Sequence, residues 1–253
     1  MICNKILKLF AEGGSILDKK LYFLLPVRSV VFVLVFIIGS ALTGKELNDI
    51  SNLWSAVATA VNILTIAMLI IAAKTNGQTY RELINYEKGK TKLREIITIT
   101  IIILSVGMGG MYIAGFLLYG KFPYIPTIMI APLPAVLAII NIPLLPVTTA
   151  FAEDGLYLGC GVGRIKNKWA AIIIPAFFFA LQHSFIPLLP DVKYIIYRFL
   201  SFLPLTVILC MYYYKKRNPL PIMIGHAIID CATVFQILAT SLIPGFYDKM
   251  IQM

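Results

Sequence analysis

The sequence predicts an all-α integral membrane protein, a polytopic bundle of about seven transmembrane helices. Apolar residues make up 59% of its 253 positions and charged residues only 13%, roughly half the charged share of a soluble domain. In lipid, every backbone amide and carbonyl needs a partner within the protein, which limits spans to helices or closed barrels. Barrel strands alternate apolar and polar residues, whereas this chain has long continuous apolar runs. Helices are therefore expected throughout.

Several apolar stretches reach the roughly 20 residues that a membrane span needs. They are residues 21–43, 50–73, 96–120, 122–152, 169–189, 194–214 and 219–243. The first is too long for the apolar core of a cleaved signal peptide, so we expect it to be retained. The fourth is rich in proline, and we expect it to continue as a kinked helix to about residue 161. With no repeat and no polar domain visible, we predict one integral membrane domain over residues 1–253.

The basic residues are concentrated in alternate connections between these stretches. The N-terminal tail and the second, fourth and sixth connections together hold 16 of the 22 Lys and Arg residues. Cytoplasmic loops are enriched in such residues, so we expect a cytoplasmic N-terminus, in the cell membrane. The polar connection at residues 74–95 is expected to lie at the membrane surface, near anionic headgroups. This placement explains the net charge of +10 by contact with the lipid bilayer, and we expect no nucleic-acid partner.

The four cysteines predict neither a disulfide framework nor a metal framework. They are Cys3, Cys160, Cys210 and Cys231, they are far apart in the sequence, and none forms a CxxC pair. Cysteines in this arrangement are typical of small packing residues.

A small set of ionisable residues falls within the apolar stretches. These are Arg28, Glu153, Asp154, His183, Arg198, His226 and Asp230. Such residues are energetically expensive in a membrane and usually mark a functional site. Arg28 and Arg198 lie within two to three turns of a span end, so we expect both to extend to the headgroups. The other five form the candidate site.

The spacing of these five residues is compatible with one shared site. His226 and Asp230 are four residues apart and project from one helix face, while Glu153 and Asp154 are adjacent and point about 100° apart. One carboxylate of that pair can therefore face a cavity while the other orients it from the side. Counted from the basic loops at about 1.5 Å per residue, Glu153, His183 and His226 lie roughly 16, 22 and 13 Å deep.

This set of side chains suits the activation of water. A carboxylate can act as general base, an imidazole beside it can share the water, and a second imidazole can stabilise an oxyanion. One carboxylate and two histidines are also the ligand set of a hydrolytic zinc site, which here would be Glu153, His183 and His226. Spacing alone leaves both versions open. A purely structural role, as interhelical hydrogen bonds, is the further alternative.

Three short motifs together resemble the CAAX protease and bacteriocin-processing family of intramembrane proteases. They are Glu153-Asp154-Gly155-Leu156-Tyr157-Leu158-Gly159, Phe179-Ala180-Leu181-Gln182-His183 and His226-Ala227-Ile228-Ile229-Asp230. The family has a double-glutamate motif that ends in Arg-Gly, then Phe-x-x-x-His, then His-x-x-x-Asn, in this order and on separate helices. The resemblance places a catalytic core at residues 143–240.

The resemblance also implies roles for individual residues. Glu153 would activate water with His183 as its partner, and His226 with Asp230 would stabilise the oxyanion. Three positions depart from the family pattern: Asp154 replaces the second Glu, Leu158 replaces the Arg, and Asp230 replaces the Asn. Without that Arg, no local guanidinium balances Asp154, and an aspartate donates no hydrogen bond unless it is protonated.

The resemblance implies a hydrolase that cleaves a peptide bond in the cytoplasmic half of the membrane. Its substrate would be a hydrophobic or membrane-anchored peptide. The family suggests prenylated CAAX proteins as one class of substrate, and it also suggests bacteriocin processing and bacteriocin self-immunity as roles. We favour a metal-free glutamate mechanism over zinc. The alternatives are a proton- or cation-coupled transporter, and a non-catalytic membrane protein of the bacteriocin-immunity type.

Overall fold

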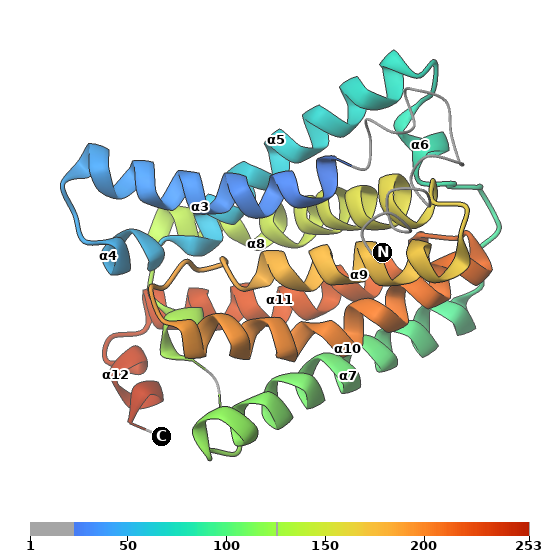
Figure 1. The fold of residues 1–253 in the computed structure, drawn as a ribbon. Helices are drawn as coiled ribbons and strands as arrows, with labels where there is room; N and C mark the ends of the chain where they lie inside the picture. Colours follow the sequence, from blue (N-terminus) through green and yellow to red (C-terminus); the bar gives the residue numbers. More distant parts are fainter. Residues whose placement is uncertain (1–22, 125, 253) are drawn as a thin grey trace, which may run out of the picture.

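The computed structural model describes residues 23–124 and 126–252, which form helices and connecting loops without a β-strand (Figure 1). The elements in order are α3 (Leu24–Thr43), α4 (Leu47–Ser51), α5 (Trp54–Thr75), α6 (Tyr80–Leu83), α7 (Leu93–Tyr119), the 3₁₀ helix η1 (Thr127–Ile130), α8 (Ala135–Thr149), the π-helix η2 (Ala150–Val162), α9 (Lys168–His183), α10 (Val192–Lys216), α11 (Leu220–Leu242) and α12 (Phe246–Ile251).

The predicted membrane bundle is confirmed. Within the described residues, six helices are long and apolar enough to cross a membrane, counting α8 and η2 as one, and α9 is a shorter apolar helix beside them. The long helices lie side by side, with α5 and α7 tilted away from the others (Figure 1). Large apolar side chains such as Leu64, Ile113 and Leu117 are exposed on the outside, which is the expected surface of a protein whose solvent is lipid.

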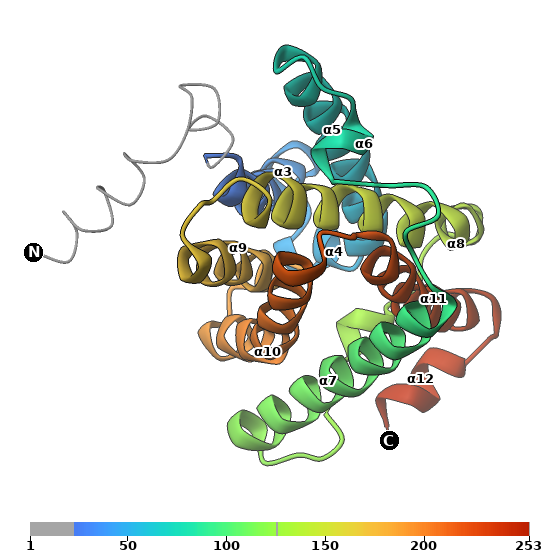
Figure 2. The same cartoon turned by 90° about the vertical axis from the view of Figure 1, so that its right-hand side faces the viewer.

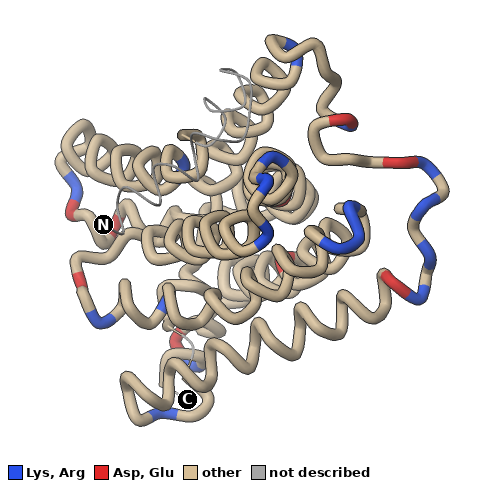
Figure 3. Tube along the Cα trace, turned by 45° about the vertical axis from the view of Figure 1, so that its right-hand side comes forward, with Lys and Arg blue, Asp and Glu red and all other residues tan. Residues whose placement is uncertain are grey.

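The charges are distributed as the alternate basic loops predict. Lysines and arginines gather at the end of the bundle where α5 ends, α9 begins and α10 ends, marked by Lys74, Lys168 and Lys216 (Figure 3). The four lysines predicted in the N-terminal tail lie outside the described residues. Which membrane surface faces the cytoplasm remains a prediction.

The fourth predicted span begins later than the sequence suggested. The described residues among 122–134 form loops around the short η1, and the continuous helix starts only at Ala135. The four prolines before that point lack an amide hydrogen and disfavour a helical residue in front of them, which explains the late start. The predicted extension is confirmed, because the helix continues to Val162, but its second part is a π-helix instead of an α-helix.

The π-helix η2 is the innermost element of the bundle. It contacts α3 and α5 on one side and α9, α10 and α11 on the other (Figure 2). Every described residue from Ala152 to Val162 is buried. Gly159 lets α6 approach closely, since a Cβ there would lie 3.1 Å from the Leu83 carbonyl oxygen. η2 thus presents its side chains to helices on all sides, and π-helical turns frequently occur at functional sites.

Candidate active site

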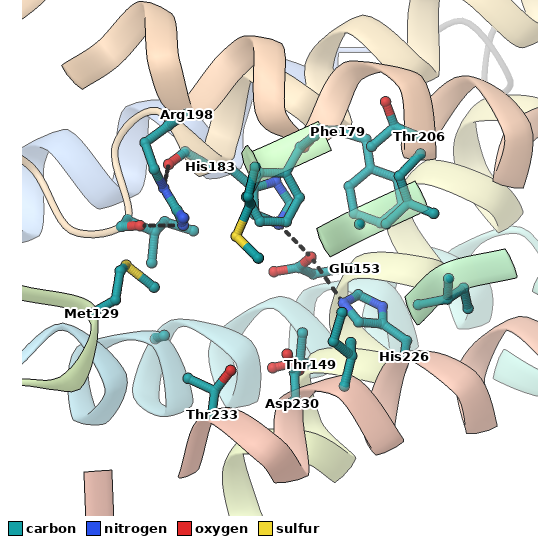
Figure 4. A pocket seen from close by; sticks show the side chains of 18 of the residues that line it. Met129, Thr149, Glu153, Phe179, His183, Arg198, Thr206, His226, Asp230 and Thr233 are labelled. Carbon is teal, nitrogen blue, oxygen red and sulfur yellow. Dashed lines mark hydrogen bonds and ion pairs between the residues drawn. The ribbon is translucent and has the colours of Figure 1, made fainter. Parts of the chain in front are cut away.

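A cavity of about 140 Å³ lies at the centre of the bundle, between η2 and helices α5, α7, α9, α10 and α11. Its polar lining includes Glu153, His183, His226, Asp230 and Arg198, and apolar side chains supply most of the remaining wall (Figure 4). Four of these five residues, all except Arg198, belong to the five predicted site residues, and the fifth, Asp154, does not line the cavity. Three different helices therefore bring the predicted carboxylate and both imidazoles to one polar pocket.

Glu153 lies between the two histidines. Its Oε2 atom is 3.8 Å from His183 Nε2 and 3.9 Å from His226 Nε2, and the side chain comes from the first turn of η2. Both distances exceed a direct hydrogen bond and fit one water molecule that contacts all three groups. Within the described structure, Oε2 is buried and has no hydrogen-bond partner, so this oxygen is available for such a water.

His183 is held in a single orientation at the end of α9. Its Nδ1 lies 2.8 Å from the carbonyl oxygen of Phe179, an acceptor, so Nδ1 carries the hydrogen and Nε2 presents its lone pair to Glu153. The imidazole also stacks on Phe202, with ring centroids 3.8 Å apart and an interplanar angle of 13°. Phe179, one turn earlier on α9, stacks on the same imidazole as well.

His226 lies opposite, on α11, with an acidic residue behind it. Its Nδ1 is 3.4 Å from Asp154 Oδ1, and Asp154 is fully buried and does not line the cavity. Glu153 therefore faces the pocket while Asp154 contacts the imidazole from the other side. Asp230 lines the cavity one turn after His226, and its Oδ2 is buried with no hydrogen-bond partner among the described residues.

Residues 135–232 match the family model described as Type II CAAX prenyl endopeptidase Rce1-like. Over these residues the chain is similar to the Rce1-like family, and we call this segment the Rce1-like domain. The matched segment runs from the start of α8 into α11 and contains all three predicted motifs, in agreement with the resemblance. No curated protein and no solved structure matches the chain. The Rce1-like domain and the apolar helices together identify an integral membrane protein with the domain of a membrane protease family.

Arg28, outside the Rce1-like domain, contacts the proposed base directly. The residue is only 2% exposed, so the expectation that it reaches the headgroups is wrong. The guanidinium donates hydrogen bonds to Glu153 Oε1 at 2.9 Å and to Thr65 at 3.0 Å, and also to Asn62 and Gln182. Burial is possible because these acceptors replace the water that the cation would otherwise need. The sequence signal that could have indicated a buried Arg28 is the presence of two polar residues, Asn62 and Thr65, inside an apolar stretch.

The expectation that Arg198 extends to the headgroups is also wrong. This residue is 2% exposed and lines the cavity, instead of extending to the membrane surface. Its Nε donates to the His183 carbonyl at 3.2 Å, and its Nη2 donates to the Ile186 carbonyl at 2.9 Å. These carbonyls lie at and just beyond the end of α9, where unpaired acceptors and the helix dipole favour a cation.

The candidate ligands for zinc are not arranged as a metal site. Across residues 23–124 and 126–252, no group of three or more His, Cys, Asp or Glu side chains has a metal-binding arrangement. Of the three candidate ligands, Glu153 already has one carboxylate oxygen on the Arg28 guanidinium, and this cation opposes the binding of a second cation. The Arg28 pair therefore favours the metal-free reaction, which stays a prediction.

Proposed function

We propose that this protein is an intramembrane endopeptidase in which Glu153 activates water for the hydrolysis of a peptide bond. The observation that carries the proposal is the position of Glu153 Oε2, buried, without a hydrogen-bond partner in the described structure, and 3.8 and 3.9 Å from two imidazole nitrogens. A purely structural cluster would satisfy this oxygen directly, because buried polar groups are normally paired.

In the proposed reaction, a water molecule binds between Glu153 and His183. Glu153 Oε2 accepts one proton of the water, His183 Nε2 accepts a hydrogen bond from the other, and the water oxygen attacks the substrate carbonyl carbon. When the tetrahedral intermediate collapses, the carbon–nitrogen bond breaks and Glu153 returns the proton to the leaving nitrogen. The ion pair with Arg28 holds Oε1, the second carboxylate oxygen of Glu153, in place during both proton transfers.

The second imidazole is placed to stabilise the oxyanion. With Nδ1 directed at Asp154, the Nε2 atom of His226 points into the pocket beside Glu153. An N–H at this position would donate to the developing negative charge, a contribution worth about 10²–10³ in rate in other proteases. Asp230 lies on the same face of α11 and is proposed as the second group beside the oxyanion.

The proposed substrate is a hydrophobic or membrane-anchored peptide, and prenylated CAAX substrates are one class within it. The apolar walls of the cavity suit apolar side chains. The distribution of lysine and arginine supports a cytoplasmic position for the basic end of the bundle, in the cell membrane. We further propose that the reaction is metal-free, because the carboxylate is paired with a cation and can act on water directly.

Proteolysis by the purified protein in detergent tests this function. The wild type should cleave a hydrophobic peptide, and Glu153→Gln and His183→Ala should each lower the rate at least about 100-fold. Glu87→Gln, which removes an exposed carboxylate outside the cavity, is the matched control and should cleave normally. Thermal unfolding identifies variants that fail only because they do not fold.

Two outcomes would contradict the mechanism. Normal cleavage by a folded Glu153→Gln variant would remove the proposed base. Loss of cleavage in a chelator, restored by added zinc, would replace the metal-free reaction with a metal-dependent one.

A further inference from the structure

Arg198 is a buried cation that has no anionic partner among the described residues. Its hydrogen bonds go to two backbone carbonyl oxygens, and its guanidinium lies over the Phe202 ring at 4.9 Å. Arg28 is equally buried but is paired with the Glu153 carboxylate. A full charge in a desolvated site is costly unless it is paired, and carbonyl dipoles at a helix end compensate only part of it. The contrast with Arg28 indicates that an anion from outside the chain pairs with the Arg198 guanidinium.

The position of Arg198 directs that anion into the cavity. Arg198 and Glu153 line the same cavity, and the chain gives the Arg198 Nη1 atom no hydrogen-bond partner within the described structure. Figure 4 shows Arg198 on one side of His183 and Glu153 on the other, with the apolar Met129 near the arginine. The pocket therefore has a cation toward one end and the proposed reaction centre toward the other.

We propose that Arg198 binds a carboxylate of the substrate peptide while the apolar part of that peptide fills the cavity. This inference rests on the proposed function and names the group that the site recognises. A planar guanidinium forms paired hydrogen bonds with a carboxylate, and a peptide can supply one from its C-terminus or from an acidic side chain. With Arg198 holding the carboxylate, the distance to Glu153 selects which peptide bond is hydrolysed.

Equilibrium binding of three fluorescent peptides tests the proposal without requiring cleavage. The first is a short apolar peptide with a free C-terminal carboxylate, the second is the same peptide as a C-terminal amide, and the third is an amide with Glu as its last residue. We expect the wild type to bind the free acid at least roughly 10-fold more tightly than the amide, the usual effect of a charged hydrogen bond. Tight binding of the third peptide identifies an acidic side chain as a second source of the carboxylate.

Three variants assign the preference to Arg198. In Arg198→Gln the ratio of the two dissociation constants should fall to about 1, whereas Arg198→Lys should keep part of it because a charge remains. Lys193→Gln removes an exposed cation from the same helix and should leave the ratio unchanged. Each ratio compares two peptides on one protein, so partial misfolding of a variant does not imitate the effect.

Two results would overturn the proposal. One is equal binding of the acid and the amide by the wild type, and the other is an unchanged preference in Arg198→Gln. A wild type that prefers the acid but cleaves no peptide would remove the proposed function and leave the carboxylate site standing.

Discussion

The guanidinium of Arg28 lies 2.9 Å from Glu153 Oε1, although 125 residues separate the two in the sequence. One oxygen of the proposed base is thereby fixed to a cation, and the other oxygen faces both histidines. The family motif places an arginine at the position of Leu158, a residue that is fully buried in the apolar core. A helix outside the matched segment supplies a guanidinium to Glu153 instead, so the matched segment alone does not contain every side chain that contacts this carboxylate.

Arg28→Gln should destabilise the protein and abolish cleavage. The substitution leaves the buried Glu153 carboxylate without its cation, and breaking a buried pair in this way costs about 3–5 kcal/mol. The stability of Arg28→Lys should lie between that of the wild type and that of Arg28→Gln. Lysine keeps the charge but cannot form the fork of hydrogen bonds to Asn62, Thr65 and Gln182. The thermal unfolding temperatures of the wild type, Arg28→Lys and Arg28→Gln in detergent measure this order of stability.

Lys45→Gln serves as the control for this prediction, because it removes an exposed lysine from the loop that follows α3. Its unfolding temperature should equal that of the wild type. If Arg28→Gln unfolded at that same temperature, the pair with Glu153 would not be needed for stability.

Asp230→Asn should retain cleavage or increase it by up to about 10-fold. The asparagine restores the residue type of the family motif and provides N–H donors next to His226, which an ionised aspartate lacks. Asp230→Leu, similar in size but without polar atoms, should reduce the rate. Initial rates with one peptide at saturating concentration compare the three proteins. A rate for Asp230→Asn as low as that of Asp230→Leu would show that the aspartate itself takes part in the reaction.

The sequence predicted the convergence of Glu153, His183 and His226 because helical spacing and depth in the membrane follow directly from residue numbers. It failed for Arg28 and Arg198, because distance from a span end does not reveal which way a helix is rotated about its axis. The acceptors that hold Arg28 come from separate helices, and only tertiary packing brings them together. The π-helical form of η2 was missed for a related reason, since a run of apolar residues gives no measure of its hydrogen-bond register.

Two adjacent glycines of α7 test how closely that helix packs on α10. A Cβ on Gly110 would collide with the Ser201 carbonyl oxygen, whereas a Cβ on Gly109 would meet nothing within 4 Å. We expect Gly110→Ala to destabilise the protein by about 1–3 kcal/mol through overpacking. Gly109→Ala should be neutral or stabilise it by up to about 1 kcal/mol, because alanine favours a helix. Equal unfolding temperatures for the two variants would contradict the close contact.

Tyr80 connects the polar loop at the basic end of the bundle to the π-helix that carries Glu153. Its hydroxyl donates a hydrogen bond to the Phe151 carbonyl at 2.6 Å. Burial, and then the proximity of Asp154, raise the pKa of Tyr80 above its ordinary value of 10.0. The stability that the protonated hydroxyl contributes is therefore fully present below pH 10 and decreases only as the pH rises further. Across the neutral range, the contact should not depend on pH.

Tyr80→Phe should lower the free energy of unfolding by about 1 kcal/mol, the usual net value of one hydrogen bond, by the same amount from pH 6 to pH 9. The ultraviolet absorbance of tyrosinate provides the second measurement, as the difference between the wild type and Tyr80→Phe. In the folded proteins this difference should show no titration near pH 10. In the proteins unfolded by dodecyl sulfate, it should titrate there like a free tyrosine. Titration near pH 10 in the folded wild type would mean that the Tyr80 hydroxyl is open to solvent and does not hold the π-helix.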